Sequence, residues 1–383
     1  MRSPRLAFSL LLLTGAIATG ATASTSADPG VSPKTILLGG TAPLSGPAAA
    51  YASVARGANA YFKYANALGG VHGRSIEYRF VDDGYNPAQT VQATRQLVEQ
   101  DKVFAIFNAL GTEHNLATRD YLKAQGVPQL FVASGATTFG ADADDYPGTI
   151  GFQPSYQAEG VIYGRYLART RPGAKVAVLF QNDDYGKDLL LGLKRGLTRS
   201  KVKVIAAQPY EVSSPDVGSQ IAKLKSSGAD VLALFATPKF AIQGYVYANK
   251  LGWKPKLTIN NAVSSASNIM TLASEGGQNK VVNGSISIVF LKDPTDPKWE
   301  KDTTMKLYRS VMKRYASSAN ANDVYHVYGM AVAWTTIELL KKIGKNLTRD
   351  GLVTAASNMS LPKNPFLLPG IAIRTSSTDH FPL

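Results

Sequence analysis

The sequence predicts an α/β protein with two similar halves, each built around a parallel β-sheet. Short apolar segments alternate with amphipathic segments of ten or more residues, the pattern of strands joined by crossover helices. The pattern occurs twice, and a stretch rich in Asp, Gly and Pro at 142–154 separates the two series. A chain of 383 residues is long enough for two domains with separate cores. We therefore expect two lobes.

Each half supplies four candidate strands. In the first half they span 35–40, 76–81, 103–107 and 129–133, and in the second half 175–180, 202–206, 231–235 and 257–260. After Asn260 we expect one more apolar strand at 281–290 and long helices at about 298–314 and 323–342. Because this remainder holds too little strand for a third sheet, we expect it to return to the first half.

The first residues are typical of an export signal. Arg2 and Arg5 precede an apolar stretch, and Ala21-Thr22-Ala23 has the form of a cleavage site. We expect residues 1–23 to be removed and the mature protein to be periplasmic, without a lipid anchor because the chain has no cysteine. The net charge of +14 comes from scattered basic residues, whereas nucleic-acid-binding proteins gather them on one face. This favours a solvated basic surface and no nucleic-acid partner.

The motifs that carry common enzyme chemistries are missing. The sequence contains no G-x-G-x-x-G, G-x-x-x-x-G-K-[ST], H-E-x-x-H or G-x-S-x-G. Its four histidines stand without the spacing of metal ligands. We therefore predict no catalytic residues, no metal and no cofactor, and a binding function is favoured over catalysis.

Polar residues follow the strands of the first half. Ligands of parallel α/β sheets collect at these strand ends, where helix N-termini present unpaired N–H groups. The candidates are Ser45 after the first strand, Leu110, Gly111 and Thr112 after the third, and Ser134, Gly135 and Thr137 after the fourth. Hydroxyls and N–H groups at a helix start suit a carboxylate. The alternative is that Ser45, Thr112 and Thr137 only cap helices.

The second half offers a matching set at its own strand ends. Tyr185 lies beside a glycine after the strand 175–180, Thr237 follows 231–235, and Asn261 follows 257–260. An aromatic side chain such as Tyr185 is suited to close over a flat or branched apolar group. Strand ends that face each other across two halves predict a cleft.

In the order and spacing of several motifs the chain resembles the leucine/isoleucine/valine-binding family of type I periplasmic solute-binding proteins of ABC transporters. The motifs are Pro43-Leu44-Ser45-Gly46-Pro47, residues 66–71 with Gly73-Arg74, Asp82-Asp83 with Pro87, residues 134–137, and Asp184-Tyr185-Gly186. The resemblance implies two Rossmann-like lobes, a three-crossing hinge and closure around a small ligand. It divides the chain into a first lobe of 24–151 and 286–360 and a second lobe of 152–285 and 361–383. The family usually adds a last strand beyond a stretch like 378–383, so a truncated end and a natural one both remain open.

The resemblance also implies ligand-binding roles for individual residues, which are carried over by their positions in the motifs. Gly111 and Thr112, with Gly135 and Thr137, would hold a ligand carboxylate, while Tyr51, Tyr185 and the loop at Thr237 would form the remaining walls. It implies a monomeric receptor that delivers its ligand to an inner-membrane ABC permease. A ligand sensor of the same fold and an exported hydrolase are the alternatives.

Asn261 departs from the family pattern. Amino-acid binders of the family place a glutamate there to pair with the ligand's ammonium, and a neutral amide does not offset a buried cation as a carboxylate does. The motifs at 109–112 and 131–137 are similar to a branch that binds aromatic or other organic acids. An organic carboxylate, a branched-chain or other amino acid, and an amide or urea-like ligand all remain open.

Overall fold

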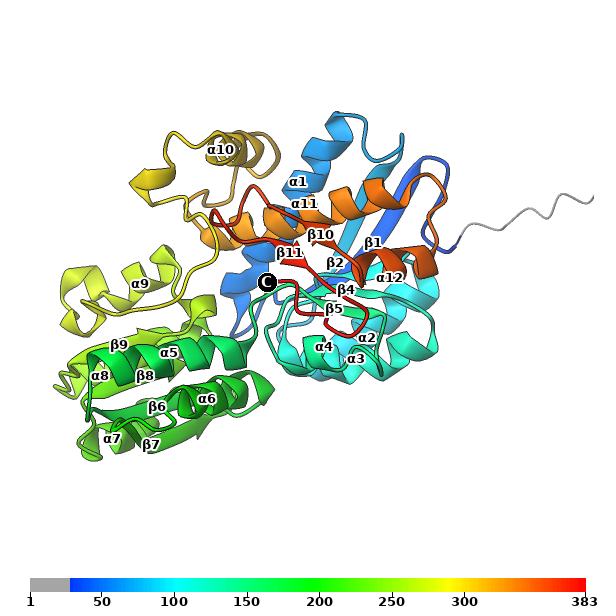
Figure 1. The fold of residues 1–383 in the computed structure, drawn as a ribbon. Coiled ribbons are helices and arrows are strands. Elements are labelled where there is room, and N and C mark those ends of the chain that lie inside the picture. Colours follow the sequence, from blue (N-terminus) through cyan, green and yellow to red (C-terminus); the bar gives the residue numbers. More distant parts are fainter. Residues whose placement is uncertain (1–27) are drawn as a thin grey trace, which may run out of the picture.

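The protein is described by a computed structural model that covers residues 28–383, so the predicted signal peptide at 1–23 lies outside the described residues. Two lobes are visible, each with a parallel sheet flanked by helices (Figure 1). The first-lobe sheet has the order β2-β1-β3-β4-β5. Its strands are β1 Thr35–Ala42, β2 Ser75–Asp82, β3 Ala105–Phe107, β4 Gln129–Val132 and β5 Thr149–Gly151.

The second-lobe sheet has the order β7-β6-β8-β9 and is also entirely parallel. Its strands are β6 Lys175–Gln181, β7 Lys203–Tyr210, β8 Val231–Phe235 and β9 Leu257–Asn260. Val176 and Val178 pack on one face, and Ala177 and Leu179 pack on the other. Helices cover both faces, which is why the strands read as continuous apolar runs.

Helices flank both sheets. In the first lobe they are α1 Ala52–Ala67, α2 Pro87–Arg95, α3 Thr112–Ala124, α4 Thr138–Ala141, α10 Thr303–Tyr315, α11 Val324–Ile343 and α12 Arg349–Ala356. In the second lobe they are α5 Tyr156–Thr170, α6 Asp184–Gly196, α7 Gly218–Ser226, α8 Pro238–Lys250 and α9 Ser267–Ala273. Side-chain caps fix several starts: Asn86 accepts from the N–H of Ala88, and Asp183 from that of Gly186.

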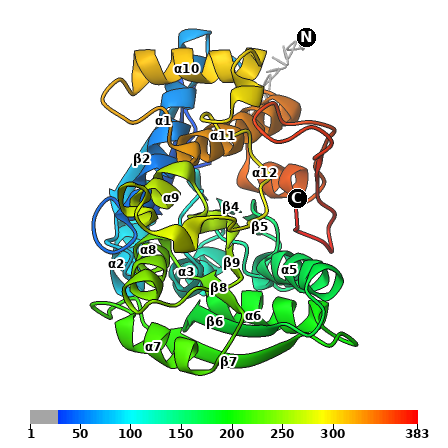
Figure 2. The ribbon, with the colours of Figure 1, turned by 90° about the vertical axis from the view of Figure 1, so that its left-hand side faces the viewer.

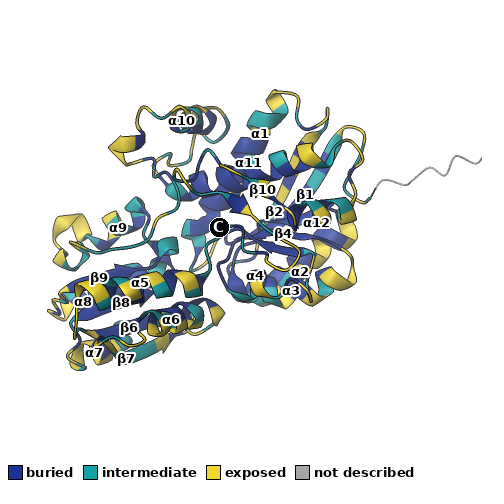
Figure 3. Cartoon of the chain, viewed as in Figure 1, coloured by how far each residue is buried: buried dark blue, intermediate teal, exposed yellow. Residues whose placement is uncertain are grey.

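The first-lobe core joins segments that are far apart in sequence. Helix α11 lies against α1, and buried residues of both helices share one cluster with Ile36 and Leu38 of β1 (Figures 2 and 3). The two helices approach so closely at Gly57 that a Cβ at this position would lie 2.3 Å from the carbonyl oxygen of His326. The segment after the second lobe thus returns to the first lobe, as predicted.

Glycines also let α5 and α6 pack with their backbones in contact. A Cβ on Gly160 would lie 2.3 Å from the carbonyl oxygen of Leu189. We expect Gly160→Ala to lower the free energy of unfolding by about 1 to 3 kcal/mol, since the helices must separate. Gly148→Ala is the matched control, because nothing lies within 3.9 Å of its added Cβ. Thermal unfolding measures both, and equal stability of the two variants would contradict the close packing.

The apolar segment 281–290, predicted as a strand, is not one. A short 3₁₀ helix at Lys280–Val282 leads into a turn in which Gly284 has a φ of 72°. Ile286 makes an isolated bridge to Ile259 of the second lobe, and Leu291 makes one to Leu367 of the first. The segment is apolar because it passes between the lobes, not because it belongs to a sheet.

Residues 361–383 lie on the first lobe, so their expected assignment to the second lobe is wrong (Figure 2). Phe366 is buried in the first-lobe core against Tyr61, and β10 Ser360–Leu361 pairs with β11 Ile373–Arg374. The N–H of His380 donates to the carbonyl of Gly140. Within residues 28–383 the chain passes between lobes at 151–156 and again at 286–291, and the third expected crossing is not found there.

Candidate functional site

A pocket lies between the lobes at the carboxyl ends of both sheets. It holds about 640 Å³ of atom-free space, counted out to its open mouth. Both strand orders reverse direction here, between β1 and β3 in one lobe and between β6 and β8 in the other. Such reversals are where open α/β sheets bind ligands, because the adjacent loops diverge and leave a crevice.

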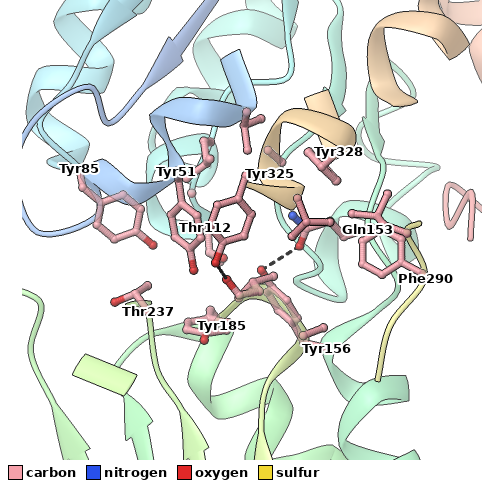
Figure 4. A pocket seen from close by; sticks show the side chains of 18 residues that line it. Tyr51, Tyr85, Thr112, Gln153, Tyr156, Tyr185, Thr237, Phe290, Tyr325 and Tyr328 are labelled. Atoms are coloured by element: carbon pink, nitrogen blue, oxygen red, sulfur yellow. Dashed lines mark hydrogen bonds between the residues drawn. The ribbon is translucent and has the colours of Figure 1, made fainter. Parts of the chain in front are cut away.

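Six of the predicted site residues line this pocket. They are Tyr51, Leu110, Gly111 and Thr112 from the first lobe and Tyr185 and Thr237 from the second (Figure 4). Gly111 precedes α3 with a φ of 115°, a conformation that strongly favours glycine. The first N–H groups of α3 have no partner within the helix, so this end of α3 offers donors to the pocket. The Thr112 hydroxyl lies 2.8 Å from the Ser134 hydroxyl.

The other five predicted residues do not enter the pocket wall. Ser45 is exposed outside it. Ser134 is buried behind Thr112, and Gly135 lies under Tyr156, where a Cβ would meet the Tyr156 ring at 2.8 Å. These three are therefore supporting or peripheral positions.

Thr137 and Asn261 are occupied by other contacts. The N–H of Thr137 donates to the Asp188 carboxylate at 2.7 Å, and its hydroxyl lies 3.1 Å from that of Ser155. The Asn261 amide donates to the carbonyls of Leu234 and Ala236, both at 2.9 Å, and so holds the end of β8. Contrary to expectation, neither residue lines the pocket, because each is committed to the protein's own backbone or side chains.

Aromatic residues that were not predicted make up much of the wall. Tyr85, Tyr156, Tyr325 and Tyr328 join Tyr51 and Tyr185, and Phe290 closes one end (Figure 4). Tyr325 and Tyr328 stand three residues apart at the start of α11, so one helical face carries both. A tyrosine pair at a capped helix start is the only sequence signal, and it does not reveal which cavity the helix faces.

Burial keeps the pocket tyrosines protonated. Desolvation raises the pKa of Tyr51, Tyr156 and Tyr185 above the ordinary value for tyrosine. Their hydroxyls are therefore donors at neutral pH. The Tyr185 hydroxyl is buried and has no hydrogen-bond partner among residues 28–383, which costs roughly 1 to 3 kcal/mol unless a bound molecule supplies one.

None of the described side chains that line the pocket carries a charge. Buried acids lie behind the wall: Asp83 and Asp323 accept from the N–H groups of the wall residues Tyr85 and Tyr325, both at 3.0 Å. Glu159 of α5 accepts from the N–H of Ala262 at 2.7 Å and from the Tyr163 hydroxyl at 2.8 Å. Burial raises the pKa of Glu159 to about 7. The electrostatic character of the pocket is therefore set by helix N–H groups and hydroxyls.

Direct contacts join the two lobes around the pocket. The Tyr325 hydroxyl donates to the carbonyl of Val263 at 2.7 Å, and the N–H of Asp184 donates to the Glu113 carboxylate at 3.3 Å. The Tyr51 hydroxyl of the first lobe also lies 3.5 Å from the Ser264 hydroxyl of the second. The lobes thus touch each other around the pocket, which keeps an open mouth.

Among residues 28–383, no group of three or more His, Asp or Glu side chains is arranged to hold a metal ion. In the same part of the chain, no helix combines the length and apolar character needed to cross a bilayer.

Comparisons with known proteins bear on the family and the fold. The sequence model of the periplasmic binding protein family matches residues 35–382. Leu/Ile/Val-binding protein homolog 2 of Brucella abortus (strain 2308) is 29% identical over 198 residues, or 51% of this chain and 53% of the relative. The chain thus spans about half the length of the curated relatives it matches.

Solved structures share the fold at low sequence identity. A branched-chain amino acid ABC transporter protein from Thermus thermophilus with bound valine superposes with a TM-score of 0.78 at 18% identity, covering 92% of each chain. A solute-binding protein of an ABC transporter from Rhodopseudomonas palustris BisB5, in complex with 3,4-dihydroxybenzoic acid, gives 0.71 at 17% identity, covering 91% of this chain and 90% of the other. Because the family match covers almost the whole chain and the two parallel-sheet lobes agree with it, this chain belongs to the periplasmic binding protein family and has the type I fold of the Leu/Ile/Val-binding proteins.

Proposed function

We propose that the protein is the extracytoplasmic receptor of an ABC transporter and binds a small organic acid with an aromatic or branched apolar body. The observation that carries the proposal is the pocket, which presents the N-terminus of α3 at Gly111 and Thr112 and is otherwise lined by uncharged side chains. A single carboxylate fits this arrangement, because helix N–H groups stabilise one negative charge. The tyrosines provide flat apolar surface for the rest of the ligand.

Amino acids are the second candidate class. The Leu/Ile/Val-binding relative favours them, and Glu159 is an acid close behind Ala262 of the pocket wall. Against them, a ligand ammonium would meet no carboxylate in the wall itself, and an unpaired buried cation is costly. The organic acid is therefore favoured.

Family membership and the two-lobed form support the transport role. The ABC transporter proteins of Thermus thermophilus and Rhodopseudomonas palustris have the same fold. We propose a periplasmic monomer that hands its ligand to a membrane permease after the lobes close. Closure is favourable because the apolar walls are buried only when the lobes meet around the ligand.

A thermal-shift screen tests the proposed ligand class. Benzoate, 4-hydroxybenzoate, leucine and valine are compared with benzamide and methyl benzoate, which keep the ring but lack the carboxylate. A ligand at 100 times its dissociation constant stabilises the native state by about 2.7 kcal/mol, enough to raise the melting temperature by several degrees. We expect the aromatic acids to give this shift and their amide and ester to give none. A shift with leucine alone would establish the amino-acid alternative.

Two threonine variants test which predicted donors face the ligand. Thr112→Val keeps the side-chain shape but removes a hydroxyl from the pocket wall, so we expect about tenfold weaker binding of the best acid from the screen. Thr137→Val is the matched control, since Thr137 lies outside the wall, and its affinity should stay within twofold of the wild type. Calorimetry measures both, and a larger loss at Thr137 would reverse the assignment.

A further inference from the structure

A second, smaller pocket adjoins the first behind Phe290. Both pockets are lined by Ala262, Phe290, Leu291 and Val324, so these four residues form a shared wall. The smaller pocket continues along Ala266, Ile288 and Val289. Its one charged group is Asp293, whose carboxylate already accepts from the hydroxyls of Ser267 and Thr295. The space beyond Phe290 is therefore a mainly apolar continuation of the main pocket.

The two ends of the main pocket differ in chemistry. Tyr85 and Phe290 lie at opposite ends, with Thr112 between them (Figure 4). At the Tyr85 end the wall also borders a wide outer groove that holds Glu113, Asp183 and Lys187. At the Phe290 end the neighbouring surface is aliphatic. An apolar group that leaves the main pocket is buried favourably only at the Phe290 end, because the charged groove would lose hydration on contact with it.

The backbone at this end is the segment that passes between the lobes. Ile286 bridges to the second-lobe sheet and Leu291 bridges to Leu367 of the first lobe, so Phe290 stands on a connection that moves when the lobes move. Its ring meets Tyr328 edge to face at 6.4 Å. Ile288 and Leu291 are half-buried, and Val289 is 66% exposed at the rim. These aliphatic groups gain burial if a ligand covers them.

We propose that the pocket behind Phe290 is a subsite for the apolar tail of the ligand acid, with Phe290 as the residue that separates the ring site from the tail site. This rests on the proposed function, because the carboxylate at the α3 N-terminus is what anchors the tail in this direction. It extends the ligand class from single-ring acids to acids that carry an alkyl tail. Because the two pockets share four wall residues, the smaller pocket continues the main one. The occupant that we propose for it is therefore part of the ligand itself.

A tail-length series tests the subsite. The probes are benzoate, 4-ethylbenzoate and 4-butylbenzoate, titrated calorimetrically into the protein. Each buried methylene strengthens binding roughly fourfold, so we expect 4-butylbenzoate to bind at least tenfold more tightly than benzoate. Phe290→Ala truncates one of the four residues of the shared wall and should keep this preference for the longer tail.

An acidic substitution at the rim tests whether the alkyl tail binds in the subsite or gains affinity from hydrophobic contacts elsewhere on the protein. Val289→Asp places a charge beside the expected tail, and because Val289 is 66% exposed the fold tolerates it. Leu272→Asp, at a side chain that is 63% exposed and outside both pockets, is the matched control. We expect Val289→Asp to lose the gain from the butyl tail while benzoate affinity is unchanged, and Leu272→Asp to retain the gain.

The outcomes distinguish this inference from the proposed function. Equal affinity of the wild type for benzoate and 4-butylbenzoate overturns the subsite alone. A tail gain that survives in Val289→Asp as fully as in Leu272→Asp also overturns it, since the tail then lies elsewhere. If benzoate and both alkyl derivatives fail to bind the wild type, the organic-acid function and the subsite both fall.

Discussion

Thr112→Asp is expected to weaken binding of the best organic acid by at least a hundredfold without lowering the melting temperature of the unliganded protein. Thr112 is the first residue of α3 and lines the pocket, so the new carboxylate would occupy the place of the ligand's own. An acid at this helix end is stabilised by the helix dipole and by the Ser134 hydroxyl, which lies 2.8 Å from the Thr112 hydroxyl. Calorimetry and thermal unfolding measure the two effects.

Thr112→Asn provides the neutral control for this substitution. Asparagine has nearly the shape of aspartate but no charge, so it should lower affinity far less. If both variants lose binding equally, the effect is steric and the carboxylate does not sit at the α3 N-terminus. Unchanged affinity in Thr112→Asp would show that the ligand does not approach this end of the helix.

The wild-type protein is expected to lose stability as pH rises, and Glu159→Gln is expected to remove the part of this loss that Glu159 causes. Burial raises the pKa of Glu159 to about 7, whereas an unfolded chain leaves a glutamate near its ordinary value. The folded state therefore holds a proton that the unfolded state releases, and stability falls as pH rises from the ordinary value through the folded pKa. Between pH 5 and pH 8 we expect the wild type to lose roughly 2 to 3 kcal/mol relative to Glu159→Gln.

Chemical denaturation at several pH values gives this difference directly. Burial also raises the pKa of Asp183, to about 6, so the wild-type profile alone mixes more than one group and only the comparison of proteins isolates Glu159. Glu77→Gln, at an exposed side chain, controls for the lost charge. A difference between wild type and Glu159→Gln that stays constant with pH would show that Glu159 is not held protonated by burial.

Much of the fold could be predicted because its signals are local. Strands buried on both faces read as apolar runs, so all eight candidate strands of the two sheets exist, with β8 and β9 at the predicted bounds. The position of 361–383 was not predictable in this way. Its docking depends on Phe366 meeting Tyr61 and on His380 meeting Gly140, contacts that link residues far apart in sequence.

Apart from Tyr51, whose role the resemblance implied, the site was predictable where a strand end leads into a helix. Gly111 and Thr112 were found because the loop and helix start are adjacent in sequence. Thr137 and Asn261 also follow strand ends, but they make hydrogen bonds within the protein and do not face the pocket. Thr137 donates its N–H to the Asp188 carboxylate, and the Asn261 amide donates to the carbonyl of Leu234. Tyr325 reaches the pocket from a helix that returns after the whole second lobe, and hydrophobic periodicity does not encode that path.

A crystal structure of the protein with the acid that gives the largest thermal shift would show whether the ligand carboxylate binds at the N-terminus of α3. We expect one ligand between the lobes, its carboxylate within hydrogen-bonding distance of the first N–H groups of α3 and the Thr112 hydroxyl, and its apolar body between Tyr51 and Tyr185. A ligand whose carboxylate faces Thr137, or one that lies in the outer groove beside Glu113 and Asp183, would overturn the proposed binding mode.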